Sequence, residues 1–128
     1  MALVDRDHER DTLDRLVASI RAGESRALVV SGDAGVGKTA LLDYLAGNVS
    51  GCRVVRTTGY QSEMELAFAA LHQLCAPLLQ GLTRLPAPQR EALRIAFGMG
   101  QGPTPDRFLV GLAVLNLLSD GAEPQPLI

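Results

Sequence analysis

Lys38 is the one lysine of this 128-residue chain, and it lies in the segment Gly32-Asp33-Ala34-Gly35-Val36-Gly37-Lys38-Thr39. The segment matches the complete G-x-x-x-x-G-K-[ST] pattern of a phosphate-binding (Walker A) loop. Its glycines permit positive φ angles, so successive backbone N–H groups can point at one anion. Lys38 supplies a full charge to the β- and γ-phosphates, and Thr39 offers a hydroxyl to Mg²⁺. The motif predicts binding of ATP or ADP with Mg²⁺ at residues 32–39.

The segments on either side of this loop have the order that a phosphate-binding loop requires. Residues 26–31 form a short, continuous apolar run with β-branched residues, which predicts a buried strand of a parallel sheet. Residues 38–46 follow with helical character, and Gly47-Asn48 ends that helix. The helix N-terminus adds roughly half a positive charge beside the phosphates. We therefore expect strand, loop and helix in succession over residues 25–47.

A helix precedes this unit. Apolar residues at helical spacing predict it within residues 1–24, and Gly23 is placed to cap its C-terminus. After the loop, a second strand is predicted over residues 53–57 and helical segments over the rest of residues 52–128.

Prolines and capping residues set the boundaries of these later helices. Ser62 and Glu65 have capping-box spacing, and Pro77 should kink or end the helix that they begin. Thr104 is predicted to cap the last long helix, with Pro105 at its first helical position. The other expected elements are a short helix from Pro88 to Phe97, a loop from Gly98 to Pro103, the last helix running to Ser119, and a loop that enters a strand at residues 124–128.

These elements together predict an α/β fold. The expected architecture is the N-terminal part, residues 1–128, of a P-loop NTPase domain in which helices cover both faces of a parallel sheet in three α/β/α layers. The chain carries few of the strands and several of the helices.

Composition excludes some classes of protein. The net charge of −2 gives no electrostatic footprint for direct nucleic-acid binding. No run approaches the roughly 18 apolar residues of a membrane span, and the start lacks the layout of a signal peptide. Cys52 and Cys75 have no metal-ligand spacing, so we expect reduced thiols in a cytoplasmic protein.

Hydrolysis also needs a carboxylate at the end of a second apolar strand. The run Val114-Leu115-Asn116-Leu117-Leu118-Ser119-Asp120 ends in an acid, and as a strand it would present Asp120. The alternative, Asp120 near the end of a helix, is favoured because Thr104-Pro105-Asp106 is a helix start and the run is long for a strand. The remaining reactive side chains are expected to pack, cap or face solvent, and these are His8, His72, Cys75, Glu63, Glu65, Arg53 and Arg56.

Several segments resemble the ATP-binding domain of large LuxR-type bacterial transcription regulators, which are signal-transduction (STAND) ATPases. Beyond the phosphate loop, the similar segments are Leu3-Val4-Asp5-Arg6-Asp7-His8-Glu9, residues 63–74, Leu85-Pro86-Ala87-Pro88-Gln89-Arg90 and residues 102–113. The resemblance implies that residues 32–39 hold ATP or ADP with Mg²⁺, that nucleotide state sets a switch, and that Arg6 lies near the adenine. Asp5 departs from the glycine that is usual in that family.

The resemblance also implies parts that lie beyond Ile128. The strand beginning after Pro126 would end in the magnesium-holding aspartate, followed by sensor repeats and a helix-turn-helix DNA-binding domain. We therefore expect the chain to bind nucleotide without hydrolysing it alone, and to have a gap in its sheet with exposed edges. Two alternatives stay open: a small P-loop phosphotransferase that uses Asp120 or an arginine, and a truncated remnant without activity. The resemblance leaves self-association of the parent protein open.

Overall fold

The computed structural model describes residues 6–60 and 68–128. The chain divides into two compact units, Met1–Val54 and Val55–Ile128. The capping box at Ser62 and Glu65 lies outside the described residues, as do Glu63 and Asp5.

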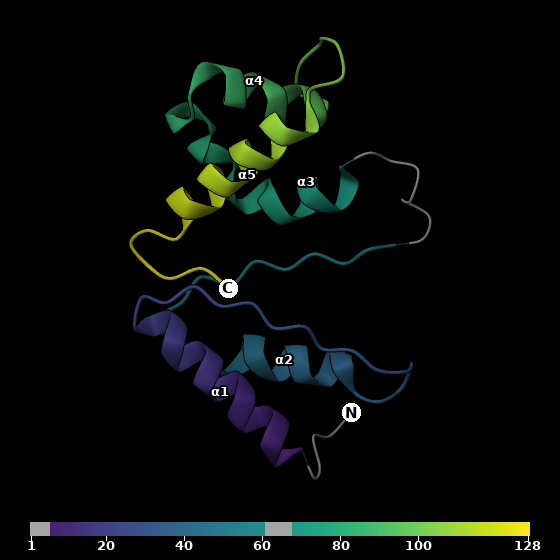
Figure 1. Cartoon of the computed structure of the whole chain (residues 1–128), viewed down its shortest axis with the longest axis vertical. Helices are drawn as coiled ribbons and strands as arrows, with labels where there is room; N and C mark the ends of the chain where they lie inside the picture. Colours follow the sequence, from purple (N-terminus) through teal and green to yellow (C-terminus); the bar gives the residue numbers. More distant parts are fainter. Residues whose placement is uncertain (1–5, 61–67) are drawn as a thin grey trace. The chain divides into compact units, whose positions relative to one another are not determined.

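The first unit contains helices α1, Asp7–Arg21, and α2, Lys38–Asn48, which pack against each other (Figure 1). Both predicted helices are confirmed, but the predicted end of the second is wrong, because α2 includes Gly47 and Asn48 and its C-cap is Val49. Gly23 follows α1 with a φ of 90° and donates its N–H to the carbonyl of Ile20 at 3.0 Å, as a helix-ending glycine does. Leu13, Val17 and Leu41 are the buried apolar side chains described in this unit.

The strand predicted over residues 26–31 is wrong. This segment has no strand pairing, and the side chains of Leu28 and Val29 are 45% and 86% exposed. A strand exists only where its backbone groups bond to a neighbouring strand, and the described part of this unit provides no such neighbour. An apolar run that could fill a buried strand therefore lies at the surface as irregular chain.

The other predicted strands are also almost absent from the described residues. Arg53 and Leu127 are isolated bridge residues rather than members of strands. In the second unit, the N–H of Val55 donates to the carbonyl of Ile128 at 2.8 Å. The described residues are thus mostly helical, and the predicted parallel sheet with its three layers is not formed among them.

The second unit is built from helices that follow one another closely. They are α3, Ala69–Cys75, the 3₁₀ helix η2, Ala76–Arg84, α4, Ala87–Ala96, and α5, Arg107–Gly121. Helix α5 packs against α4, η2 and α3, as Figure 1 shows for α4 and α5. Their shared core consists of Cys75, Leu78, Leu82, Leu85, Ala92, Leu93, Phe97, Val110, Ala113, Val114 and Leu117.

Prolines and glycines set most of these boundaries as expected. Helix α3 ends at Cys75, and the chain continues as 3₁₀ helix through Pro77, where the missing N–H and the ring oppose α-helical bonding. Helix α4 matches its prediction within one residue at each end. Gly98 then adopts a φ of 72° and donates to Ile95, which closes the helix.

The start of α5 differs from its prediction. Asp106, and not Thr104, is the N-cap, and its Oδ1 accepts from the backbone N of Phe108 at 3.2 Å. Pro105 disfavours helical geometry at the residue before it, and the short carboxylate of Asp106 reaches the second free N–H of the helix. The helix also continues to Gly121, two residues past the predicted end.

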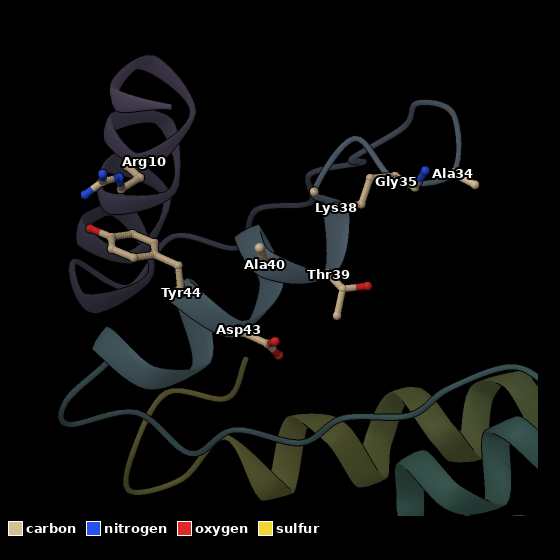
Figure 2. A pocket seen from close by; sticks show the side chains of 9 residues that line it. Arg10, Ala34, Gly35, Lys38, Thr39, Ala40, Asp43 and Tyr44 are labelled. Atoms are coloured by element: carbon tan, nitrogen blue, oxygen red, sulfur yellow. The ribbon is translucent and has the colours of Figure 1, made fainter. Parts of the chain in front are cut away.

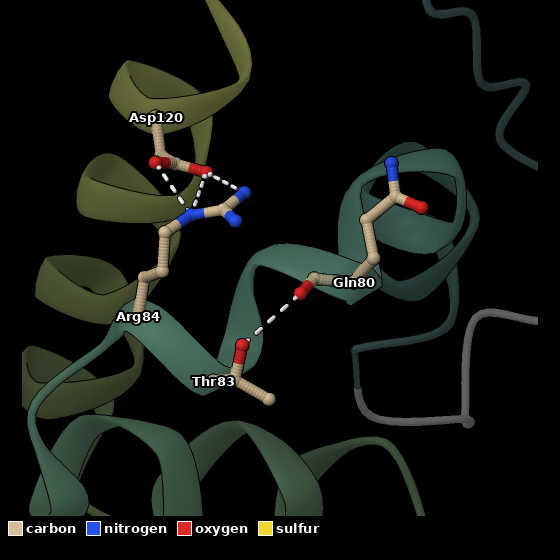
Figure 3. Close-up of polar contacts among 4 residues, drawn as sticks. All are labelled: Gln80, Thr83, Arg84 and Asp120. Carbon is tan, nitrogen blue, oxygen red and sulfur yellow. Dashed lines mark hydrogen bonds and ion pairs between the residues drawn. The ribbon is translucent and has the colours of Figure 1, made fainter.

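Asp120 lies on α5, so the interpretation as a helix residue is confirmed and that as a strand acid is wrong. Arg84 of η2 donates to it as a fork, with Nε 3.0 and 3.1 Å from the two carboxylate oxygens and Nη2 2.7 Å from Oδ2 (Figure 3). The hydrogen bonds from Arg84 hold the pKa of the Asp120 carboxyl below its usual value.

None of the helices in residues 6–60 and 68–128 combines the length and the apolar character that crossing a bilayer would take.

Candidate functional site

The phosphate loop joins the irregular segment to the start of α2, and its backbone takes the conformations that the motif predicts. Gly35 and Gly37 have φ angles of 85° and 95°, which lie in the left-handed region that favours glycine. At Gly32 a Cβ atom would lie 2.9 Å from Cγ2 of Val36. Side chains at these glycines would therefore strain or obstruct the loop.

Lys38 is the first residue of α2, and its side chain turns back across the loop. Nζ donates to the carbonyl of Gly32 and, at 2.8 Å, to the carbonyl of Asp33. An ammonium group has three N–H donors, so these carbonyls use two of them. The positive charge of Lys38 is thus held over the loop by the loop's own backbone.

The N-terminus of α2 favours an anion. Gly37 is its N-cap and provides no side chain to bond the first backbone N–H groups, and the first helical turn contains no acidic residue. These N–H groups carry the positive end of the helix dipole. Thr39, in the same turn, is exposed, so its hydroxyl is accessible to a ligand.

Arg6 lies against the same loop. Its guanidinium donates to the carbonyl of Val36, and Nη1 is 3.9 Å from the carboxylate of Glu9. Arg6 therefore links the start of α1 to the backbone of the phosphate loop. The adenine contact that the resemblance implies for Arg6 stays a prediction.

A cavity of about 820 Å³ lies beside the loop (Figure 2). It brings together five of the predicted residues with four that the motif did not identify. The predicted ones are Ala34, Gly35, Gly37, Lys38 and Thr39, and the additional ones are Arg10, Ala40, Asp43 and Tyr44. Of the remaining predicted residues, Gly32 and Asp33 hold Lys38, and Val36 accepts from Arg6.

Helical spacing could have identified the additional residues that belong to α2, which are Ala40, Asp43 and Tyr44. Once α2 begins at Lys38, Ala40 and Tyr44 lie one turn apart on one side of it, and Thr39 and Asp43 do the same. Figure 2 shows the Thr39 and Asp43 side chains pointing to the same side of α2. Arg10 carries no such signal, because it belongs to α1 and reaches the cavity only through the packing of α1 on α2.

Tyr44 and Arg10 form a defined arrangement at the wall made by the two helices. The hydroxyl of Tyr44 donates to the carboxylate of Asp14, with 3.1 Å to Oδ1 and 3.3 Å to Oδ2. The Arg10 guanidinium carbon lies 5.7 Å from the centre of the Tyr44 ring, a cation–π distance. The hydrogen bond to Asp14 raises the pKa of Tyr44 because the carboxylate favours the protonated phenol.

Three other reactive residues lie in packing or surface positions. His72 stacks on Phe97 with 4.8 Å between ring centres, and His8 is exposed on α1. Cys75 is fully buried, and burial raises the pKa of its thiol. Across residues 6–60 and 68–128, no group of three or more His, Cys, Asp or Glu side chains is arranged to hold a metal ion.

Comparison with the models of known protein families gives a match over nearly the whole chain. The model of the AAA ATPase domain family matches residues 2–127 of the chain. Neither the curated proteins nor the solved structures contain a significant match. Because the family match spans nearly the whole sequence, the chain belongs to the AAA ATPase domain family, and membership implies that it binds a nucleotide.

Proposed function

We propose that residues 32–39 bind the phosphates of ATP or ADP together with Mg²⁺. The observation that carries this proposal is the convergence of three features on one cavity: the Lys38 ammonium, the left-handed glycines and the N-terminus of α2. Each of these features favours negative charge. A glycine-rich turn without a ligand would need neither Lys38 nor the hydroxyl of Thr39.

The residues present fit a nucleotide with magnesium. The cavity volume of about 820 Å³ lies within the range of small-molecule sites. Backbone N–H groups of the loop and Lys38 would hold the β- and γ-phosphates, and the Thr39 hydroxyl would hold Mg²⁺. The metal would neutralise charge on the phosphate oxygens.

Binding without turnover is the activity that we propose for this chain alone. The phosphotransferase alternative uses Asp120 or an arginine as its catalytic partner, and Asp120 of α5 is engaged with Arg84 of η2. A phosphotransferase that depends on Asp120 therefore gains no support from its surroundings.

For the parent protein we propose a nucleotide-dependent switch that regulates transcription, as in LuxR-type regulators. The support is the resemblance of residues 63–74 and 102–113 to those proteins. Sequencing the source gene past codon 128 tests this. An apolar strand ending in Asp-Asp or Asp-Glu, followed later by a helix-turn-helix domain, would support it, and a stop codon directly after Ile128 would contradict it.

A thermal-shift titration with Mg-ATP tests nucleotide binding directly. Ligand at 100 times its dissociation constant should add about 2.7 kcal/mol of apparent stability to the wild-type chain. Lys38→Ala should lose most of this shift, because each charge-assisted hydrogen bond contributes about 1.5–3 kcal/mol.

Arg26→Ala is the matched control. Arg26 is an exposed cation near the loop that pairs with Glu24 and does not line the cavity, so its removal should leave the shift intact. No shift in the wild type, or an equal shift in Lys38→Ala, would overturn the proposal.

A further inference from the structure

Asp43 brings a negative charge into a cavity whose other features favour anions. Of the described residues that line the cavity beside the phosphate loop, Asp43 is the only acidic one. The Lys38 ammonium, the glycine-rich loop and the N-terminus of α2 all favour negative charge there. The carboxylate of Asp43 opposes them, because like charges repel. Binding of phosphate groups alone therefore does not explain an acid at this position.

A divalent cation on the phosphates would turn this repulsion into attraction. Resting on the proposed nucleotide binding, we propose that Asp43 makes the site selective for the magnesium complex of a nucleotide over the metal-free nucleotide. Asp43 is then a specificity-determining residue outside the phosphate-loop motif, which ends at Thr39.

Helix α2 places Asp43 on the side that carries Thr39. The two residues are four apart in this helix, so they lie on one face with an axial separation of about 6 Å. Figure 2 shows both side chains extending from that side, whereas the Tyr44 side chain extends toward Arg10 of α1. Both residues are exposed, and both line the same cavity. The Thr39 hydroxyl and the Asp43 carboxylate can therefore act on one ligand.

The chemistry of magnesium gives these two side chains different tasks. Mg²⁺ prefers oxygen ligands and keeps several of its waters when it is bound through phosphates and one or two protein groups. Those waters are hydrogen-bond donors, and an ionised carboxylate accepts more strongly than a neutral group does. Thr39 would contribute its hydroxyl to the metal, and Asp43, one turn further along α2, would accept from the metal's waters.

The alternative is that Asp43 is an ordinary surface acid of α2 with no role in binding. An exposed acid acts through a screened interaction, so the expected effect on affinity is modest. The two interpretations still differ in a measurable way. A surface acid leaves the preference for Mg-ATP over metal-free ATP unchanged, whereas an acid that reads the metal changes the two affinities in opposite directions.

Isothermal titration calorimetry of the purified chain, with ATP in excess Mg²⁺ or in EDTA, tests this selectivity. The ratio of the two dissociation constants measures the preference of the site for Mg-ATP. Asp43→Asn should lower this ratio by about 3- to 10-fold, the size expected for one exposed charge beside a triphosphate. The variant should bind Mg-ATP more weakly than the wild type and metal-free ATP more tightly. Its helix content should be unchanged, because asparagine and aspartate have similar helix propensities.

Two further variants separate the carboxylate from the net charge of the chain. Asp43→Glu keeps the negative charge on the same face of α2 and should retain most of the wild-type preference. Glu24→Gln removes an acid that pairs with Arg26 and does not line the cavity, so it should match the wild type. An equal change of the ratio in Asp43→Asn and Glu24→Gln would reveal a general charge effect and overturn the proposal.

The outcomes distinguish this inference from the proposed function. If the wild-type chain binds neither form of ATP, the proposed nucleotide binding is wrong. If Asp43→Asn binds Mg-ATP with the affinity of the wild type, nucleotide binding stands and the selectivity assigned to Asp43 is refuted.

Discussion

The two units of the chain differ in how they bury apolar side chains. In Val55–Ile128, a continuous cluster from Cys75 to Leu117 is buried between helices. In the described part of Met1–Val54, three apolar side chains are buried and Val29 is 86% exposed. The unit that carries the phosphate loop therefore has the smaller core.

The physical reason lies in how each kind of backbone satisfies its hydrogen bonds. A helix bonds its own backbone, so α5 needs only packing partners, and helices close in sequence supply them. Phe108 and Leu115 are also exposed, but on a helix whose backbone is already bonded. The segment 26–31 would need neighbouring strands as well as packing. A binding loop can thus be formed locally while the element before it is not.

The largest effect is expected when one apolar side chain is replaced in each unit, which tests the difference in burial between the two units. Leu93 is fully buried in α4, so Leu93→Ala should lower the free energy of unfolding by about 2–5 kcal/mol. Val29→Ala removes an exposed side chain and should change it by no more than about 0.5 kcal/mol. Urea denaturation followed by circular dichroism measures both, and equal losses would refute the contrast.

A smaller effect on stability is expected when either of two glycines of α5 is replaced by alanine. A Cβ atom on Gly121 would lie 2.8 Å from Cδ2 of Leu78, whereas at Gly111 it would meet nothing within 4 Å. Gly121→Ala should destabilise the chain by about 1–3 kcal/mol through overpacking. Gly111→Ala should stabilise it by about 0.5–1 kcal/mol, because alanine favours the helix. Thermal melts would measure the two shifts, and shifts of the same sign would contradict this account of α5.

The smallest effect concerns the ion pair between Arg84 and Asp120. Because Arg84 lowers the Asp120 pKa in the folded chain below the usual 3.8, the pair stabilises the fold above that pH. The contribution is lost as pH falls through the lowered pKa. It should be modest, since the Arg84 side chain is 63% exposed.

Urea denaturation at several pH values across this acid range would measure the contribution of the ion pair to the free energy of unfolding. Asp120→Asn should be less stable than the wild type near neutral pH, and the difference should shrink on acidification. Arg84→Gln should behave in the same way, and the double variant should lose little more than either single variant. A difference that grows on acidification would contradict the assigned direction.

The helices could be predicted because their signals are local. Gly23, Pro77 and Gly98 set helix boundaries through their own backbone preferences. The difference at α5 is also local, since the sequence predicts Pro105 at the first helical position whereas Asp106 is the N-cap. Strands could not be predicted equally well, because an apolar run does not reveal whether a partner strand is present.

The residues of the candidate site also divide into those that a local sequence signal identifies and those that only the fold brings together. The motif identified Gly32 to Thr39, because the spacing of glycines, lysine and threonine is contained in one short segment. Arg10 and Tyr44 come together only through the packing of α1 on α2. The link from Arg6 to Val36 likewise joins residues far apart in sequence.

The bonds from Lys38 to its own loop have a consequence for selectivity. Since the carbonyls of Gly32 and Asp33 already accept from the ammonium, an incoming anion must compensate for the bonds that it displaces. A halide ion offers a single acceptor atom, whereas a chain of phosphates offers several oxygens to Lys38 and the backbone N–H groups together. The two loop carbonyls thus compete with an incoming anion for the Lys38 ammonium. A polyphosphate can compensate for the displaced bonds better than a small anion can.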